Sequence, residues 1–127
     1  MSAAQNALIE EKKLKLELRL AQLEKNEKCQ NNFLTFVKTV WPDFIAGRHH
    51  RIIAEKLERV ARGELKRLII NMAPRHTKSE FASYLFPAWF MGRMPNKKII
   101  QATHTTELAV NFGRKTKNLL ESDEFRE

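Results

Sequence analysis

Apolar positions along the chain follow two different periods, and the changes between them divide the sequence into elements. Helical spacing first appears in the stripe of Phe33, Phe36, Val37, Val40 and Trp41. Asn31 or Asn32 can cap this helix at its start, and Pro42 ends it. A further helix is predicted over about residues 49–62, and Gly63 is well placed to terminate it.

After residue 63, helical spacing gives way to short segments in which nearly every residue is apolar. Residues 67–72 and 98–103 are rich in β-branched side chains, and the first run is expected to be a strand covered on both faces. A helix should begin near Lys78 between them, with Pro87 kinking or splitting it. Strand, helix and strand in this order predict a βαβ unit with a parallel pair and a right-handed crossover.

A last helix completes the pattern. Thr105 or Thr106 can cap it, and it should extend to about Leu120 with Leu108, Phe112 and Leu119 pointing inward. The two tryptophans, Trp41 and Trp89, belong to helical stripes, so we expect both in the core rather than stacked on bases.

Residues 1–28 differ from the rest in composition. They hold six Lys or Arg and five Glu but no Gly, Pro or aromatic residue, which predicts a charged leader helix. Its leucines do not form one clean stripe, because Leu14 and Leu18 lie away from the face shared by the others. The stripe is too short and smeared to identify a coiled coil. We expect a solvated or loosely docked helix, with a partner-binding helix as the alternative.

Composition narrows the class of protein. A chain of 127 residues with 43% hydrophobic and 30% charged residues is large enough for one folded domain. Its apolar runs fall well short of the ~18 residues of a membrane span. We expect no secretory signal, because residues 1–13 show no basic start followed by an apolar stretch. A single cysteine, Cys29, cannot form an internal disulfide and indicates a reducing compartment. The formal charge of +8 favours polyanionic partners such as nucleic acid or nucleotide phosphates.

The segment with the clearest chemical signal is residues 72–79, MAPRHTKS, between the first expected strand and its helix. Amides at a helix N-terminus attract an anion, a lysine there can reach a phosphate, and a following hydroxyl can ligate Mg²⁺. Lys78 and Ser79 occupy the last two positions of G-x-x-x-x-G-K-[ST], but Met72 and Thr77 replace both glycines. A β-branched residue such as Thr77 resists the positive φ that glycine adopts readily.

The block from Arg67 to Leu120 resembles the start of the ATPase domain in the large terminase subunit of tailed bacteriophages. That family often carries a deviant Walker A loop of the form P-R-H-G-K-S, and residues 74–79 read PRHTKS here. The next helix also fits the family pattern, at Pro87, Ala88, Trp89 and Gly92.

The resemblance extends over about residues 33–127. It implies an α/β fold: an incomplete P-loop NTPase (RecA-like) domain with about two parallel strands, preceded by N-terminal helices. The expected organisation is a leader over residues 1–28 and the N-terminal portion of the ATPase domain over residues 29–127.

The same resemblance implies ATP and Mg²⁺ as cofactors. Lys78 would contact the β- and γ-phosphates, Ser79 would hold Mg²⁺, and Arg75 would stabilise charge near the γ-phosphate. The expected nucleotide-binding residues are Ala73, Pro74, Arg75, His76, Thr77, Lys78 and Ser79.

Three further histidines are candidates outside the loop. His49 and His50 lie near where these motors contact the adenine, with exposed, solvated side chains as the simpler alternative. His104 follows the second expected strand, at the carboxyl end of the sheet, and is a candidate for a phosphate, DNA or coupling role.

The family's partners are double-stranded viral DNA, the small terminase subunit and the portal protein, in an oligomeric ring without a membrane. The expected location is the host cytoplasm, transiently at the procapsid portal. A Walker B motif and nuclease carboxylates do not follow in this sequence, so we expect the front portion of a larger motor.

The sequence does not decide whether this chain hydrolyses ATP by itself. Exposed strand edges and low solubility are predicted. The alternatives are a nucleic-acid- or protein-binding fragment with a vestigial loop, and part of another P-loop translocase or helicase.

Overall fold

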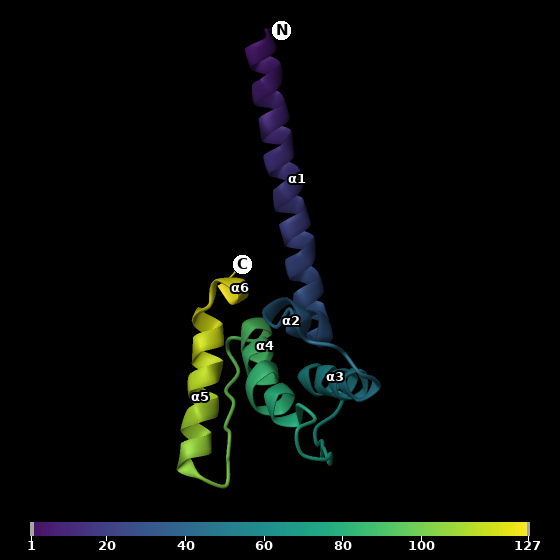
Figure 1. The fold of residues 1–127 in the computed structure, drawn as a ribbon, viewed down its shortest axis with the longest axis vertical. Coiled ribbons are helices and arrows are strands. Elements are labelled where there is room, and N and C mark those ends of the chain that lie inside the picture. Colours follow the sequence, from purple (N-terminus) through teal and green to yellow (C-terminus); the bar gives the residue numbers. More distant parts are fainter. Residues whose placement is uncertain (1, 127) are drawn as a thin grey trace.

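The computed structural model describes residues 2–126 and consists of helices joined by extended segments and loops (Figure 1). The π-helical segment η1 continues directly into α4, so the two form one helical run. The elements are α1 (Ala3–Asn31), α2 (Phe33–Val40), α3 (Arg48–Ala61), η1 (Glu80–Leu85), α4 (Phe86–Arg93), α5 (Thr106–Glu121) and α6 (Asp123–Arg126). No β-strand occurs among residues 2–126, so the expected α/β, RecA-like fold with two parallel strands is wrong.

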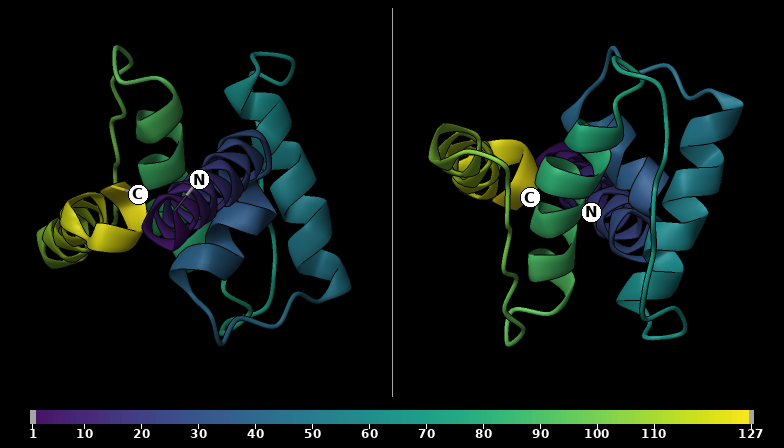
Figure 2. Two further views of the ribbon diagram at one scale, coloured as in Figure 1. Left: turned by 90° about the horizontal axis from the view of Figure 1, so that it is seen from above. Right: turned by 90° about the horizontal axis from the view of Figure 1, so that it is seen from below.

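Both segments that were expected to be strands are extended but unpaired. Residues 67–72 run along α3 and residues 98–103 run along the other side of the η1–α4 run (Figures 1 and 2). Within the described chain, neither segment forms a hydrogen bond from backbone to backbone. Ile69 is 84% exposed and Ile100 is 95% exposed, so each segment is covered on one face only. β-branched residues favour an extended backbone, but a sheet also requires two such backbones to lie edge to edge.

The core lies where α2, α3 and the η1–α4 run meet. Phe33 is completely buried there, with its ring 5.5 Å from Phe81, 5.9 Å from Phe86 and 5.3 Å from Trp89 between centroids. In both views of Figure 2, α3 and α5 flank this centre on opposite sides. Trp41, expected in the core, is instead 37% exposed, because α2 ends at Val40.

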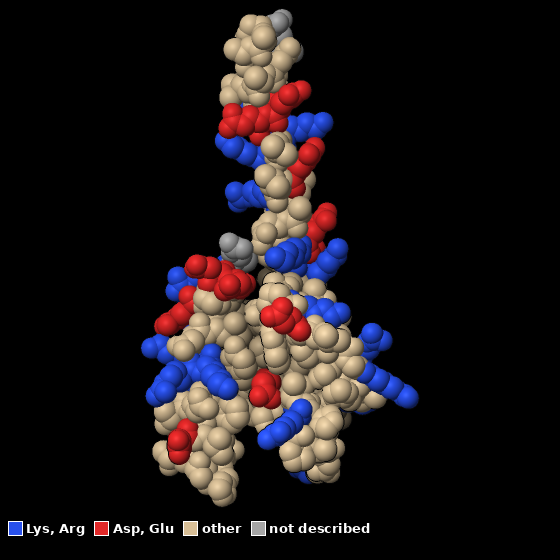
Figure 3. Space-filling view, in the orientation of Figure 1, with Lys and Arg blue, Asp and Glu red and all other residues tan. Residues whose placement is uncertain are grey.

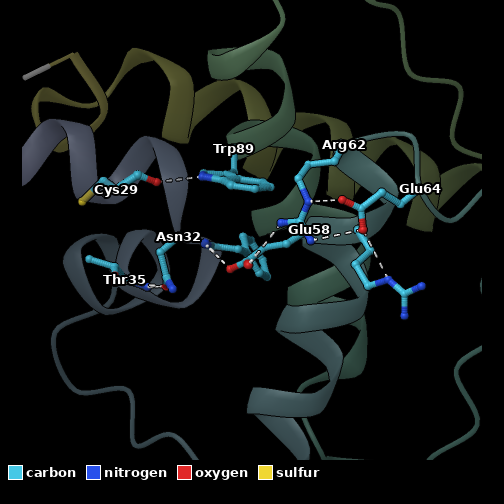
Figure 4. A network of polar contacts seen from close by, with 9 residues as sticks. Cys29, Asn32, Thr35, Glu58, Arg62, Glu64 and Trp89 are labelled. Atoms are coloured by element: carbon cyan, nitrogen blue, oxygen red, sulfur yellow. Dashed lines mark hydrogen bonds and ion pairs between the residues drawn. The ribbon is translucent and has the colours of Figure 1, made fainter.

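The predicted helix ends are confirmed. The Asn32 side chain accepts a hydrogen bond from the Thr35 amide and caps α2 (Figure 4). The Thr105 hydroxyl accepts from the Leu108 amide and caps α5 in the same way. Gly63 has a φ of 78° just beyond α3, the left-handed conformation that commonly ends a helix. Leu108, one turn into α5, does not point inward as expected and is 41% exposed.

Pro87 lies where the run changes from π-helix to α-helix, but it does not split the run into two separate helices. The amide of Phe86 donates to the carbonyl of Phe81, five residues back, so the turn before the proline is π-helical. Pro87 has no N–H to donate to the carbonyl of Ser83, four residues back. The side-chain amide of Gln101 donates to this carbonyl instead and ties the second extended segment to η1.

The leader sequence forms α1, a single helix of 29 residues that projects from the body of the molecule (Figure 1). None of its described side chains is buried. It is anchored near its C-terminal end, where the indole N–H of Trp89 donates to the Cys29 carbonyl at 2.8 Å (Figure 4). Among the described residues, no helix is both long enough and apolar enough to cross a membrane.

Candidate phosphate-binding loop

Residues 72–79 form a turn that leads from the first extended segment into the η1–α4 run. The helical conformation begins at Lys78, as the sequence predicted. The amide of Phe81 donates to the Thr77 carbonyl at 3.0 Å. The amides of Lys78, Ser79 and Glu80 therefore lie in the first turn, where an α-helix offers its amides no acceptor of its own. The helix dipole adds partial positive charge at the same place.

The loop backbone is left-handed at two alternate residues. Arg75 has a φ of 65° and Thr77 has a φ of 59°, although neither is glycine. A left-handed L-residue costs roughly 1–2 kcal/mol, and a β-branched side chain such as that of Thr77 is among the least suited to it. Left-handed residues next to right-handed ones turn successive amides towards one side, which is the geometry of anion-binding backbone concavities. The loop thus adopts without glycine the curl for which glycine is the usual residue.

A hydrogen-bond chain from α3 supports the strained residue. The Gly47 amide donates to Nδ1 of His50 at 2.8 Å, which makes Nδ1 an acceptor and leaves the ring proton on Nε2. Nε2 lies 2.6 Å from Oγ1 of Thr77 and therefore donates to that hydroxyl. The Thr77 hydroxyl in turn donates to the carbonyl of His76 at 2.7 Å. Each polar atom in this chain has a defined donor or acceptor role.

His50 is held in its neutral form by its surroundings. Its side chain is buried and packs against the rings of Phe44 and Phe81, with centroids 4.7 Å and 5.2 Å away. Burial lowers the pKa of His50, and the nearby His49 and His76 rings lower it further. A neutral ring is the state that can accept from Gly47 and donate to Thr77 at the same time.

Lys78 places its ammonium group across the mouth of the loop. Its Nζ donates to the carbonyl of Met72 at 2.9 Å, so the first and seventh residues of the segment are joined. The lysine is half-buried, which limits the directions its charge can take. An anion held by the loop amides would therefore find the ammonium group beside it.

Ser79, the expected magnesium ligand, lies in the first turn of this helical run. Its side chain makes no capping hydrogen bond at the helix start. Among residues 2–126, no group of three His, Cys, Asp or Glu side chains is placed to hold a metal. Mg²⁺ commonly takes one or two protein oxygens and completes its shell with water and substrate phosphates.

The structure gathers most of the candidate histidines at the loop. The His49 ring lies 3.8 Å from His50 and 5.8 Å from His76 between centroids. Arg75 lies exposed at the tip of the turn. His104 is exposed before α5, and no hydrogen bond, ion pair or ring contact within residues 2–126 joins it to the loop.

Sequence reasoning missed the pairing of His50 with Thr77 and treated exposure as the simpler reading for His50. The available signal was Gly47, three residues before it. A Cβ atom at this position would lie 2.9 Å from Cε1 of His49, so glycine lets the two histidine rings pack closely against the backbone of residue 47. A groove of about 540 Å³ adjoins His49, between α3 and the first extended segment. Its lining is mainly apolar and includes His49, Ile52, Ile53, Leu68, Ile70 and Met72.

Comparisons with known proteins identify no relative of this chain. No family model matches it, and neither a curated protein nor a solved structure is significantly similar to it. What the loop does must therefore follow from its own residues and from the motif that they form.

Proposed function

We propose that residues 72–79 bind the phosphates of ATP. The observation that carries the proposal is the turn itself, which is left-handed at Arg75 and Thr77, opens a helix at Lys78 and holds the Lys78 ammonium across its mouth. Amides of a helical first turn, a lysine beside them and a hydroxyl after it are together suited to a phosphate chain.

Each side chain has a distinct role in this proposal. Lys78 exchanges its bond to the Met72 carbonyl for the β- and γ-phosphate oxygens, and Ser79 gives one oxygen to the Mg²⁺ that accompanies the nucleotide. Arg75, exposed at the tip of the turn, stabilises negative charge near the γ-phosphate. The groove beside His49 accommodates the adenine, because it is apolar and adjoins the loop at Met72.

On the resemblance of its loop, we propose further that the chain is the nucleotide-binding portion of a viral DNA-packaging motor. Its partners would then be double-stranded viral DNA, the small terminase subunit, the portal protein and other copies in a ring, at the procapsid portal in the host cytoplasm. The charge supports a DNA partner, because residues 29–127 carry 17 of the 23 basic residues but only 10 of the 15 acidic ones.

Titration with fluorescent ATP and Mg²⁺ tests the loop. Lys78→Ala is expected to weaken binding about 10- to 100-fold, since a charge-assisted hydrogen bond contributes about 1.5–3 kcal/mol. Lys98→Ala is the matched control, because Lys98 is an exposed lysine outside the loop. Equal affinity of Lys78→Ala and Lys98→Ala, with both variants folded by circular dichroism, would contradict a phosphate site at residues 72–79.

A second candidate is nucleic-acid binding with a vestigial loop. It is favoured by the basic side chains that are scattered over the body of the molecule in Figure 3. Arg114, Lys115 and Lys117 of α5 are exposed. This alternative predicts duplex DNA binding that weakens steeply with salt. The affinity would be unchanged by ATP and by Lys78→Ala, whereas a packaging motor should bind DNA in a nucleotide-dependent way.

A further inference from the structure

The exposed leucines of α1 have no partner within the described chain. Leu8, Leu14, Leu18 and the rest of its large apolar side chains are each more than half exposed, up to 63% at Leu18. A single helix in water gains little from such side chains, because most helical stability in proteins comes from packing an apolar face. α1 is nevertheless continuous over 29 residues, about 43 Å at the rise of an α-helix.

Four of these side chains form one narrow stripe. At about 100° per residue, Ile9, Leu16, Leu20 and Leu23 fall within an arc of about 60°. The stripe points away from the body of the molecule. The half-buried residues of α1 are Gln22, Asn26 and Cys29, and they are centred about 120° around the helix from the stripe. The body therefore leaves the stripe open along its whole length.

Charges of opposite sign line the two edges of the stripe. Glu10, Glu17 and Glu24 recur every seven residues along one edge. Lys12 and Arg19 recur with the same spacing along the other edge. This is the arrangement of a coiled-coil seam, with Ile9, Leu16 and Leu23 at the d positions, the glutamates at e and the basic residues at g.

We propose that α1 pairs with α1 of a second copy of this chain, parallel and in register. In a parallel pair, a g residue meets the e residue five positions further on in the other helix. Lys12 then faces Glu17 of the second copy, and Arg19 faces Glu24 of the second copy. An antiparallel pair would bring g to g and e to e, so that like charges would meet along both edges.

The remaining a positions set the strength of this dimer. Leu20 is apolar, but Asn6, Lys13 and Glu27 are polar. Polar residues at a positions weaken a coiled coil while fixing its register. The dimer is therefore concentration-dependent, and Lys13→Ile should tighten it, because that change replaces two facing ammonium groups with a packed pair.

Sedimentation equilibrium of the full chain over a range of concentrations tests the pairing. Leu16→Lys is expected to raise the dimer dissociation constant about tenfold or more. Leu18→Lys is the matched control, since Leu16 and Leu18 are 62% and 63% exposed but lie on different faces of α1. The proposal would be overturned if both the wild-type chain and the Lys13→Ile variant stayed monomeric. Equal effects of Leu16→Lys and Leu18→Lys would also overturn it.

Orientation has its own test. In a Cys29→Ser background, Asn6→Cys places a thiol at an a position near the N-terminal end of α1. A parallel dimer brings the two thiols together, so mild oxidation should give a cross-linked dimer. If the variant forms a dimer by sedimentation but no cross-link on oxidation, the parallel arrangement is contradicted.

Discussion

Thr77 combines backbone strain with a hydrogen bond that sustains it. Its φ of 59° suits glycine, while its hydroxyl connects His50 to the loop. Thr77→Gly and Thr77→Ala both remove the hydroxyl, but only alanine retains a Cβ atom in the left-handed conformation. We expect Thr77→Gly to be about 1 kcal/mol more stable than Thr77→Ala in urea denaturation. Equal stabilities would mean that the loop does not keep this conformation in solution.

His50 makes the stability of the molecule depend on pH. Its pKa is lowered from 6.5 in the folded protein by burial, then by the neighbouring His49 and His76. The unfolded chain therefore binds a proton more readily, so the free energy of unfolding should fall as pH drops below about 6.5. Denaturation at pH 7.5 and pH 5.5 measures this loss. His50→Gln, which has no titrating ring, should reduce the difference between the two pH values. An unchanged difference would exclude His50 as its source.

At the scale of elements, one side chain of α3 forms a hydrogen bond to the backbone of α2. Oε1 of Glu58 in α3 accepts from the Phe33 amide at 2.9 Å, in the first turn of α2, and Arg62 holds the same carboxylate (Figure 4). Glu58→Ala leaves that amide without its acceptor and should lower the free energy of unfolding by about 1–2 kcal/mol. Glu58→Gln keeps an acceptor oxygen and should lose clearly less. Thermal unfolding of both variants separates the hydrogen bond from the charge.

The helices could be predicted from the sequence and the strands could not, for a physical reason. Caps and breakers such as Asn32, Gly63 and Pro87 act within a few residues, so local sequence contains their effect. An extended segment becomes a strand only by hydrogen bonding to a distant one, and the runs around Ile69 and Ile100 do not meet. Within the site, the position of the turn was predictable from Lys78. The support of Thr77 by His50, 27 residues away, was not.

At the scale of the whole molecule, the two extended segments leave unpaired backbone and apolar side chains at the surface. Such edges are templates for pairing with another chain. We expect Ile69→Lys and Ile100→Lys each to reduce aggregation, measured by light scattering on concentration, without lowering the melting temperature by more than about 2 °C, because both side chains are almost fully exposed. Unchanged scattering would indicate that these residues are covered in solution.

The π-helical turn before Pro87 sets the angle between the loop and the core. An α-helix turns about 100° per residue, and a π-turn accommodates one extra residue within the same helical run. Removing one residue from 86–88, where the run is α-helical, would rotate Lys78 by about 100° relative to Trp89. The Trp89 indole and the Lys78 ammonium group would then no longer face their separate partners. The number of residues between them should therefore tolerate substitution better than deletion.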